Sequence, residues 1–174
     1  MRWLLLLRHA KAIVATGRDD HERPLVDRGR RDAARIGAFV REIDMIPDLL
    51  IDSGAVRTRQ TAMIAAAAWP GDVATRVEPK LYEANWTTIQ ELARALPDKT
   101  QHVMLVAHNP GLADLASHLA GRGARSEMQR MAAKFPTCAL AVLEFDVDRW
   151  RDVEPGGALL ARFVTPDDPH MGGE

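Results

Sequence analysis

Side chains that can bind an anion follow three apolar runs of the sequence. Two arginines, two histidines and a serine stand at these places: Arg8, His9, Ser53, Arg57 and His108. Guanidinium groups bind phosphate and carboxylate oxygens through paired hydrogen bonds. Because an arginine stands directly beside an imidazole, we expect an anionic substrate, with phosphate as the leading candidate.

The three apolar runs, 4–7, 49–51 and 103–107, are expected to bring these side chains together. Short continuous apolar runs are typical of strands that are buried on both faces. In an open parallel sheet, ligands bind beyond the carboxyl ends of the strands. We therefore expect the polar residues to meet at one sheet edge, with Arg57 at a helix N-terminus that favours anions.

Helical patterns alternate with these strands through the first two thirds of the chain. Each expected helix has a start signal or an apolar face at helical spacing. Four helices are expected: 28–43 with Asp27 as its cap, 55–69, one that begins at a capping box of Thr88 and Glu91, and one with Pro110 in its first position.

The last third of the chain contains two further apolar runs, 138–145 and 158–164, joined by a turn-rich segment. Two strands with such a connection most simply pair antiparallel. The whole pattern favours an α/β protein, a three-layer α/β/α sandwich with a mostly parallel central sheet and an antiparallel C-terminal strand pair. We expect one domain over 1–165 and a frayed C-terminal tail over 166–174.

The composition excludes several classes of function. A net charge of −1 gives no general reason to expect nucleic acid or an anionic membrane surface as a partner. The single cysteine, Cys138, excludes an internal disulfide and a multi-cysteine zinc cluster, and it fits a reducing compartment. The first apolar run ends at Arg8, too early for a signal peptide or a membrane span. We expect a cytoplasmic monomer.

Several segments together resemble the motifs of the histidine phosphatase superfamily. Its Arg-His-Gly signature is similar to Leu7-Arg8-His9-Ala10. The other similar segments follow in the family's order: 23–25 with Gly29, 53–62, 81–83 and 107–111. The resemblance covers about two thirds of the chain, from residue 4 to residue 112. It implies a fold like that of the phosphoglycerate mutases.

The resemblance also implies a role for individual residues. His9 would be the nucleophile that becomes transiently phosphorylated, and Glu83 would donate and accept the proton. The ligands of the phosphoryl oxygens would be Arg8, Arg57 and His108, and Arg23 could reach the site from its loop. A nucleophilic imidazole must be neutral, and neighbouring positive charge favours that form. The arginines would stabilise the transition state, so neither a metal nor another cofactor is implied.

Two departures from the family pattern bear on the substrate. Ala10 stands where the signature has glycine, which reduces backbone freedom. Only a short helix fits between Glu83 and the run at 103, so a helical lid is not expected and the site should be open. Both features resemble the small bacterial phosphohistidine phosphatases of the SixA type. The open site favours phosphohistidine on a partner protein of the phosphotransfer type as the substrate.

Two alternatives stay open at this point. Glu83 suits the hydrolysis of phosphate esters, so the chain could be a small-molecule phosphomonoesterase. A non-catalytic phosphate-binding scaffold could keep the fold, although it would have no need of the nucleophile His9. A zinc site built from His9 and His108 lacks the usual third ligand.

Overall fold

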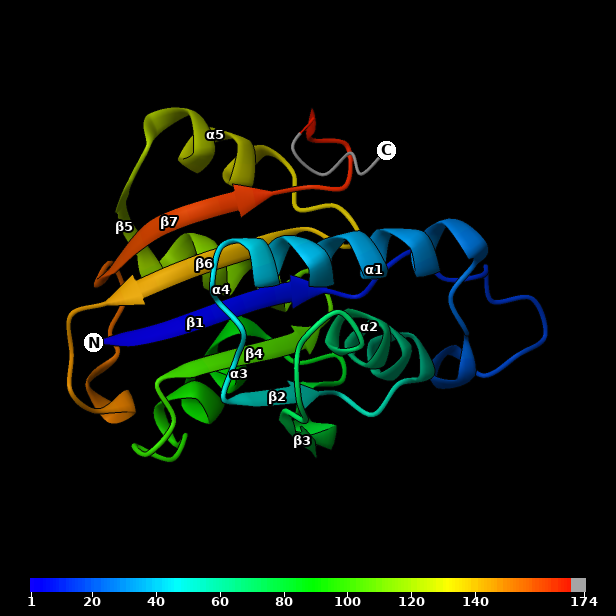
Figure 1. Cartoon of the computed structure of the whole chain (residues 1–174), viewed down its shortest axis with the longest axis horizontal. Coiled ribbons are helices and arrows are strands. Elements are labelled where there is room, and N and C mark those ends of the chain that lie inside the picture. Colours follow the sequence, from blue (N-terminus) through cyan, green and yellow to red (C-terminus); the bar gives the residue numbers. More distant parts are fainter. Residues whose placement is uncertain (170–174) are drawn as a thin grey trace.

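A sheet of seven strands forms the centre of the computed structural model, which describes residues 1–169 (Figure 1). The strands, in chain order, are β1 (Arg2–Arg8), β2 (Leu49–Asp52), β3 (Ala74–Val77), β4 (His102–Ala107), β5 (Ala120–Gly123), β6 (Leu140–Phe145) and β7 (Ala158–Val164). Their order across the sheet is β3-β2-β4-β1-β6-β7-β5. The three apolar runs that precede the polar motifs are therefore adjacent central strands.

Most neighbouring strands run parallel. β4 pairs in parallel with both β1 and β2, and β2 pairs in parallel with β3. β6 is the exception, because it is antiparallel to β1 and to β7. The predicted mostly parallel sheet with an antiparallel C-terminal strand pair is confirmed.

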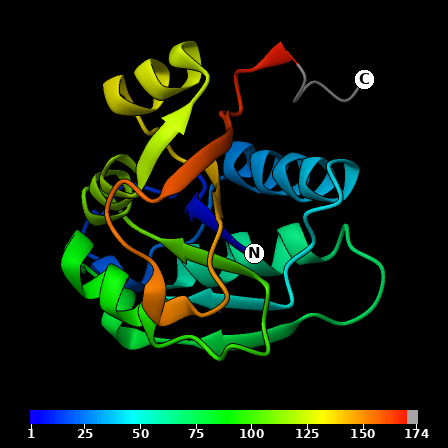
Figure 2. The same cartoon turned by 90° about the vertical axis from the view of Figure 1, so that its left-hand side faces the viewer.

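Helices cover both faces of the sheet, as the view turned by 90° in Figure 2 shows. They are α1 (Asp27–Glu42), α2 (Val56–Ala66), α3 (Trp86–Arg94), α4 (Gly111–Leu119) and α5 (Arg125–Ala133). Alternate residues of β1 point to opposite layers: Leu5 and Leu7 pack with α1 and α2, whereas Leu4 and Leu6 pack with α3 and α4. This alternation confirms the three-layer sandwich. Within residues 1–169, no helix is long and apolar enough to cross a membrane.

All four predicted helix starts are wrong by one to three residues. α2 begins at Val56 rather than at 55, and it ends at Ala66 rather than at 69. α1 begins at Asp27 itself, and Val26 is its cap. The cap of α3 is Asn85, whose side-chain oxygen accepts a hydrogen bond from the backbone N–H of Thr88 at 2.9 Å. Asparagine is a strong helix cap, so it displaces the predicted capping box at Thr88. Pro110 is the cap of α4 and precedes its first residue.

The segment from 120 to 133 and the C-terminal tail also differ from expectation. β5 and α5 have no counterpart among the predicted elements, because the sequence Ala-Gly-Arg-Gly of β5 has little strand propensity of its own. Residues 166–169 do not fray: Asp167 pairs with Arg28 at 3.2 Å, and Asp168 pairs with Arg130. The rest of the predicted tail, 170–174, lies outside the described residues.

The start of α4 lies against the segment that carries Glu83. A Cβ atom on Gly111 would stand 2.0 Å from the backbone oxygen of Ala84, which no real contact allows. Glycine is therefore required where α4 packs on this segment.

Replacing Gly111 with alanine should push these two segments apart. Overpacking of this kind costs about 1–3 kcal/mol, so we expect Gly111→Ala to lower the free energy of unfolding by that amount. Urea unfolding measures the change, with Ser117→Ala on the exposed side of α4 as the control. Equal stability of the two variants would contradict the close contact.

Candidate active site

The carboxyl ends of β1, β2 and β4 open into one pocket of about 360 Å³. Its lining consists of Arg8, His9, Asp20, Arg57, Glu83, His108, Asn109 and Pro110. The structure thus brings together five of the six predicted site residues. The sixth, Arg23, does not line the pocket but contacts it through an ion pair with Asp20 at 3.2 Å. We refer to this space as the site pocket.

His9 follows the end of β1 and presents one definite nitrogen to the site. Its side chain is 7% exposed, and Nδ1 lies 2.8 Å from the backbone oxygen of Ala10. A carbonyl oxygen only accepts hydrogen bonds, so Nδ1 must carry a proton. In the neutral ring, Nε2 then holds the free lone pair. The arrangement leaves an unprotonated nitrogen available for bond formation.

Burial explains why this ring is neutral. Burial is the largest cause that lowers the pKa of His9 to about 4. The hydrogen bond to Ala10 acts in the opposite direction, and the positive charges of Arg57, Arg8 and Arg23 lower the pKa further. Sequence reasoning attributed the neutral form to neighbouring charge alone. In the structure, burial lowers the pKa of His9 more than the neighbouring charges do.

Ala10 fits its place without the conformational freedom of glycine. Among residues 1–169, the non-glycine residues with a positive φ are Asp44, Glu83 and Cys138, and Ala10 is not one of them. The Ala10 N–H donates to Thr61 Oγ1 at 3.0 Å, and Thr61 in turn donates to the backbone oxygen of Arg57 at 2.7 Å. Thr61 thereby links the backbone beside His9 to helix α2.

Cys138 contacts the backbone of Arg8 and His9. It is fully buried, and its backbone N–H lies 3.1 Å from the oxygen of Arg8 and 3.0 Å from that of His9. Its φ of 61° ends the extended run, so β6 begins only at Leu140 rather than at the predicted residue 138. Burial raises the pKa of its thiol. Cys138 therefore acts here through its backbone.

His108 lies at the end of β4 in a chain of hydrogen bonds. Thr58 Oγ1 donates to the backbone oxygen of Ala55, so it must accept from Ser53 Oγ at 2.9 Å. Ser53 Oγ must then accept from His108 Nε2 at 2.7 Å, which places the proton on Nε2. His108 Nδ1 is left to accept from Arg57 Nη2 at 3.2 Å. Burial and the charge of Arg57 lower the pKa of His108 to about 3.

Three arginines around the site have buried donors that no residue of 1–169 satisfies. The Nε groups of Arg8, Arg23 and Arg57 are buried without a hydrogen-bond partner in this part of the chain. Arg8 uses Nη1 to donate to the oxygen of Phe135 at 3.0 Å. Unsatisfied buried donors are costly, and charged ones more so. Two of these arginines, Arg8 and Arg57, line the site pocket, where a guanidinium group can bind an anion.

Asp20 and Tyr82 are the site residues that sequence reasoning missed. Asp20 lies in a 3₁₀ turn, Asp20–Glu22, within the blue loop at the right of Figure 1. Its carboxylate accepts from Arg57 Nη2 at 3.0 Å and from Tyr82 Oη at 2.5 Å. The loop shows no periodicity in the sequence, so no local signal distinguishes Asp20 from its neighbour Asp19.

Glu83 also lines the site pocket, just after a 3₁₀ turn at Pro79–Leu81. Its φ of 53° is unusual for a residue with a side chain, and its side chain is exposed. Leu81, which is buried, anchors this turn in the core. The carboxylate can therefore exchange protons with water and with a molecule bound in the pocket.

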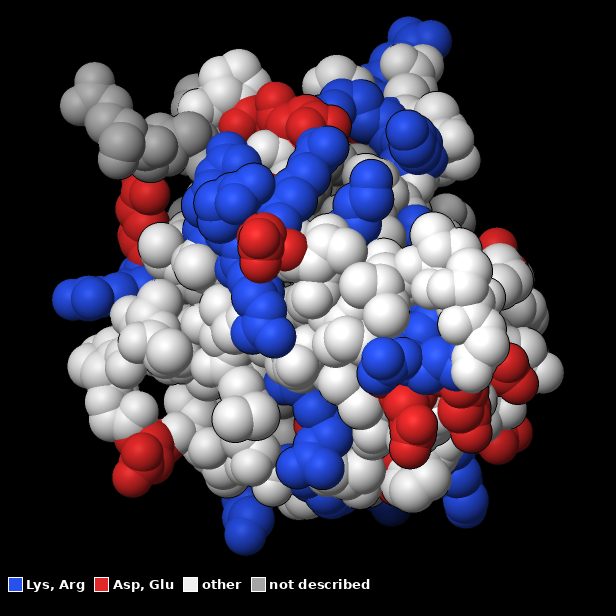
Figure 3. All heavy atoms as spheres, turned by 90° about the vertical axis from the view of Figure 1, so that its right-hand side faces the viewer, with Lys and Arg blue, Asp and Glu red and all other residues white. Residues whose placement is uncertain are grey.

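Positive charge surrounds this end of the molecule. Lys and Arg side chains gather on the upper part of the face shown in Figure 3. A second pocket of about 320 Å³ is lined by Lys11, Arg28 and Lys134, together with two aspartates. Its lining residues are close in sequence to the site: Lys11 follows His9 by two residues, and Lys134 precedes Phe135, whose backbone oxygen accepts from Arg8.

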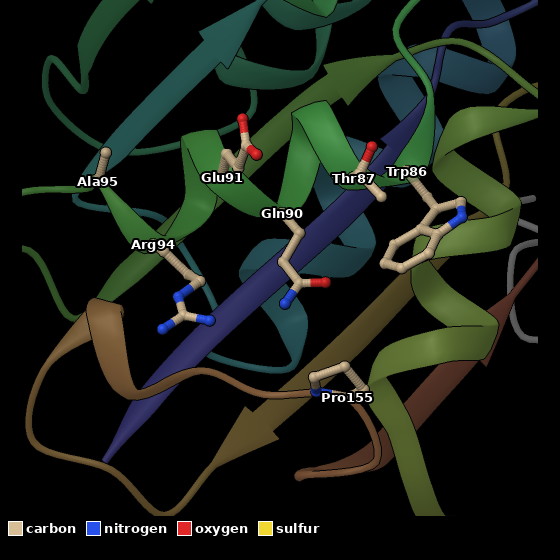
Figure 4. A pocket seen from close by; sticks show the side chains of 7 residues that line it. All are labelled: Trp86, Thr87, Gln90, Glu91, Arg94, Ala95 and Pro155. Atoms are coloured by element: carbon tan, nitrogen blue, oxygen red, sulfur yellow. The ribbon is translucent and has the colours of Figure 1, made fainter.

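A larger groove of about 530 Å³ lies elsewhere, between α3 and Pro155 (Figure 4). Trp86, Thr87, Gln90, Glu91, Arg94 and Ala95 form its other walls. It contains none of the predicted site residues. His9 and His108, whose pKa values are lowered to about 4 and about 3, line the site pocket, so we assign the chemistry there.

Comparison with known proteins agrees with this geometry. The model of a family described as the histidine phosphatase superfamily (branch 1) matches residues 4–98. An uncharacterized protein of Mycobacterium tuberculosis is 35% identical over 162 residues, which covers 92% of this chain and 99% of that protein. An uncharacterized chloroplastic protein of Arabidopsis thaliana is 30% identical over 181 residues, covering 95% of this chain and 78% of its own.

Two solved structures are similar over nearly the whole chain. A presumed phosphohistidine phosphatase SixA from Agrobacterium tumefaciens has a TM-score of 0.80 and 30% identity, with 95% of this chain and 98% of that chain covered. The protein histidine phosphatase SixA complexed with tungstate has a TM-score of 0.74, with 94% and 97% covered. At 18% identity, the second comparison supports the fold alone.

The two buried histidines should make stability depend on pH. In the unfolded chain their pKa is near 6.5, whereas His9 and His108 fall to about 4 and about 3 in the folded protein. As the pH drops below 6.5, these histidines bind protons in the unfolded state but not in the folded state. The free energy of unfolding therefore decreases. We expect the stability advantage of wild type over His9→Gln to shrink by about 2 kcal/mol between pH 7 and 4.5.

Urea unfolding at the two pH values measures this difference. His118→Gln, which changes an exposed histidine of α4, is the control and should follow the wild type. Parallel pH dependence of wild type and His9→Gln would show that burial does not hold His9 neutral.

Proposed function

The chain belongs to the histidine phosphatase superfamily and is a phosphatase, and on that premise we propose that it acts through a phosphohistidine intermediate on His9. The observation that carries this proposal is the hydrogen bond from His9 Nδ1 to Ala10, at 2.8 Å. It leaves Nε2 as the nucleophilic nitrogen, and burial keeps the ring neutral near pH 7.

The proposed reaction has two steps. His9 Nε2 attacks phosphorus, and the bond from phosphorus to the leaving group breaks while Glu83 donates a proton to that group. Water then attacks the phosphorus of phosphohistidine, Glu83 accepts a proton from the water, and His9 leaves. Inorganic phosphate is the product, and Glu83 ends in its starting protonation state.

The arginines supply the electrostatic stabilisation. Arg8 and Arg57 line the site pocket, where their guanidinium groups can bind the oxygens of the transferring phosphoryl group. Arg23 contributes charge from the adjoining loop through its contact with Asp20. A phosphoryl dianion would also favour protonation of His108 at Nδ1, which would turn that nitrogen from an acceptor into a donor. No step of this scheme calls for a metal.

We favour phosphohistidine on a partner protein as the substrate. Helix α3 has only nine residues between Glu83 and β4, and no helical lid stands over the pocket in the described residues. An open pocket admits a side chain that projects from another protein. The similarity to the presumed phosphohistidine phosphatase of Agrobacterium tumefaciens, at 30% identity, supports the same substrate class. The exposed carboxylate of Glu83 favours small phosphate esters as the second candidate.

Removing the nucleophile tests the proposal directly. We expect His9→Ala to lower turnover of an aryl phosphate and of a phosphohistidine protein at least about 10³-fold, because both need the same nitrogen. Activity of the wild type should be the same with and without EDTA. His102→Ala, at the opposite end of β4, is the control. A wild type that binds phosphate but turns over neither substrate would instead be a scaffold.

A second variant separates the two substrate classes. An alkoxide needs a proton to leave, whereas a protonated imidazole already is a good leaving group. Glu83→Gln should therefore reduce ester hydrolysis by about 10²–10⁴-fold and phosphohistidine hydrolysis far less. Steady-state kinetics on both substrates give the ratio, with Glu91→Gln on the exposed side of α3 as the control. Equal losses on both substrates would refute the leaving-group argument.

A further inference from the structure

Asp20 occupies the part of Arg57 that a phosphoryl group would use. Arg57 Nη1 donates to the backbone oxygen of Asp20 at 2.7 Å, and Nη2 donates to its Oδ2 at 3.0 Å. Paired hydrogen bonds from two guanidinium nitrogens are the arrangement by which arginine binds phosphate. One residue of the protein therefore holds both terminal nitrogens of a proposed phosphate ligand.

Two side chains distant in sequence, Arg57 and Tyr82, and the nearby Arg23 hold Asp20 in this position. Tyr82, from the segment before Glu83, donates to Oδ2 at 2.5 Å, and Arg23 pairs with Oδ1 at 3.2 Å. The Tyr82 hydrogen bond is the largest cause that lowers the pKa of Asp20, with Arg57 and Arg23 adding to it. Asp20 is therefore an anion at neutral pH.

We propose that Asp20 is an internal competitor for Arg57, which a phosphoryl dianion displaces and a singly charged anion does not. This inference rests on the proposed function, because it takes Arg57 to be a ligand of the phosphoryl group. It makes Asp20 a specificity-determining residue. The site would discriminate against carboxylates and other monoanions before any chemistry occurs.

The exposure of the two partners makes the exchange feasible. The Asp20 side chain is 43% exposed, whereas that of Arg57 is only 7% exposed. Asp20 can therefore turn into water while Arg57 stays in place. Its loop is closed at its base by pairing of Ala12 with Leu25, and residues 14–19 between them are exposed. The turn that carries Asp20 can shift without disturbing the sheet.

Charge explains the selectivity. A monoanion would replace one carboxylate by another single charge and gain no attraction to Arg57. A phosphoryl dianion brings twice the charge, and Coulomb energy scales with it. A half-exposed ion pair such as Asp20–Arg57 contributes little, equivalent to a few-fold in an equilibrium constant. Competition should therefore weaken dianion binding only modestly and suppress monoanion binding.

Binding of inorganic phosphate and of acetate to the intact protein tests the proposal by calorimetry at pH 7.5. Asp20→Asn should bind phosphate about three- to tenfold more tightly than wild type, because it removes a competitor of that strength. It should also acquire measurable acetate binding. Glu22→Gln removes a charge from the same turn without touching Arg57 and should bind phosphate as wild type does.

Tyr82→Phe separates competition from simple loss of negative charge. It removes the hydrogen bond to Asp20 but changes no charge, and it retains the ring that faces Arg57 at 5.9 Å. We expect it to tighten phosphate binding about twofold, the effect of one weak hydrogen bond. Tighter binding by Asp20→Asn alone, with Tyr82→Phe unchanged, would indicate a charge effect and overturn the proposal.

Two other outcomes have distinct meanings. Weaker or unchanged phosphate binding by Asp20→Asn would show that Asp20 positions Arg57 rather than competes for it, and would overturn the inference alone. Phosphate binding that does not depend on Arg57, measured with Arg57→Ala, would instead contradict the proposed phosphate site itself. The melting temperature of each variant confirms that it is folded.

Discussion

The electrostatic cost of burying cationic groups is the constraint on which the site depends. Two arginines and two histidines, Arg8, Arg57, His9 and His108, share one pocket at the carboxyl end of the sheet. Charges removed from water must be paired or neutralised. The arginines stay charged and take oxygen acceptors from Phe135 and Asp20. The histidines give up their charge, and a neutral His9 is what nucleophilic attack requires.

The fold holds these groups through backbone contacts as much as through side chains. The carbonyl oxygen of Ala10 accepts a hydrogen bond from His9 Nδ1, and the N–H of Ala10 donates to Thr61 of α2. The backbone N–H of Cys138 donates to the backbone oxygens of Arg8 and His9. His9, the proposed nucleophile, is therefore held largely by backbone atoms, which any residue possesses. This explains how alanine can stand at position 10 of the signature, where its φ is not in the left-handed region.

The pocket also contains a gradient of solvent exposure. His9, Arg57 and His108 are buried and bonded on several sides, whereas Asp20 and Glu83 lie near the solvent. The buried groups form the base to which a phosphoryl group would bind, and the exposed carboxylates form the walls. Such a division places the buried, hydrogen-bonded groups where charge must be oriented. It leaves the groups that exchange protons or positions in contact with water.

The sequence by itself determined the central strands, the layer order and the residues at the strand ends. These features follow from local patterns: continuous apolar runs give β1, β2 and β4, and the residues after them must lie at one edge of a parallel sheet. The order of the motifs along the chain then led to the family. Arg8, His9, Arg57, Glu83 and His108 could all be named on this basis.

The tertiary structure alone decided how these residues act on one another. Asp20 is 37 residues from Arg57 and 62 from Tyr82, and no local pattern encodes contacts over such separations. The proton positions of His9 and His108 depend on the carbonyl of Ala10 and on Ser53, whose placement only the fold fixes. The low pKa of His9 results mainly from burial, which is a property of packing. Sequence patterns identify groups; their protonation and pairing are set by distances and solvent exclusion, which exist only in the folded chain.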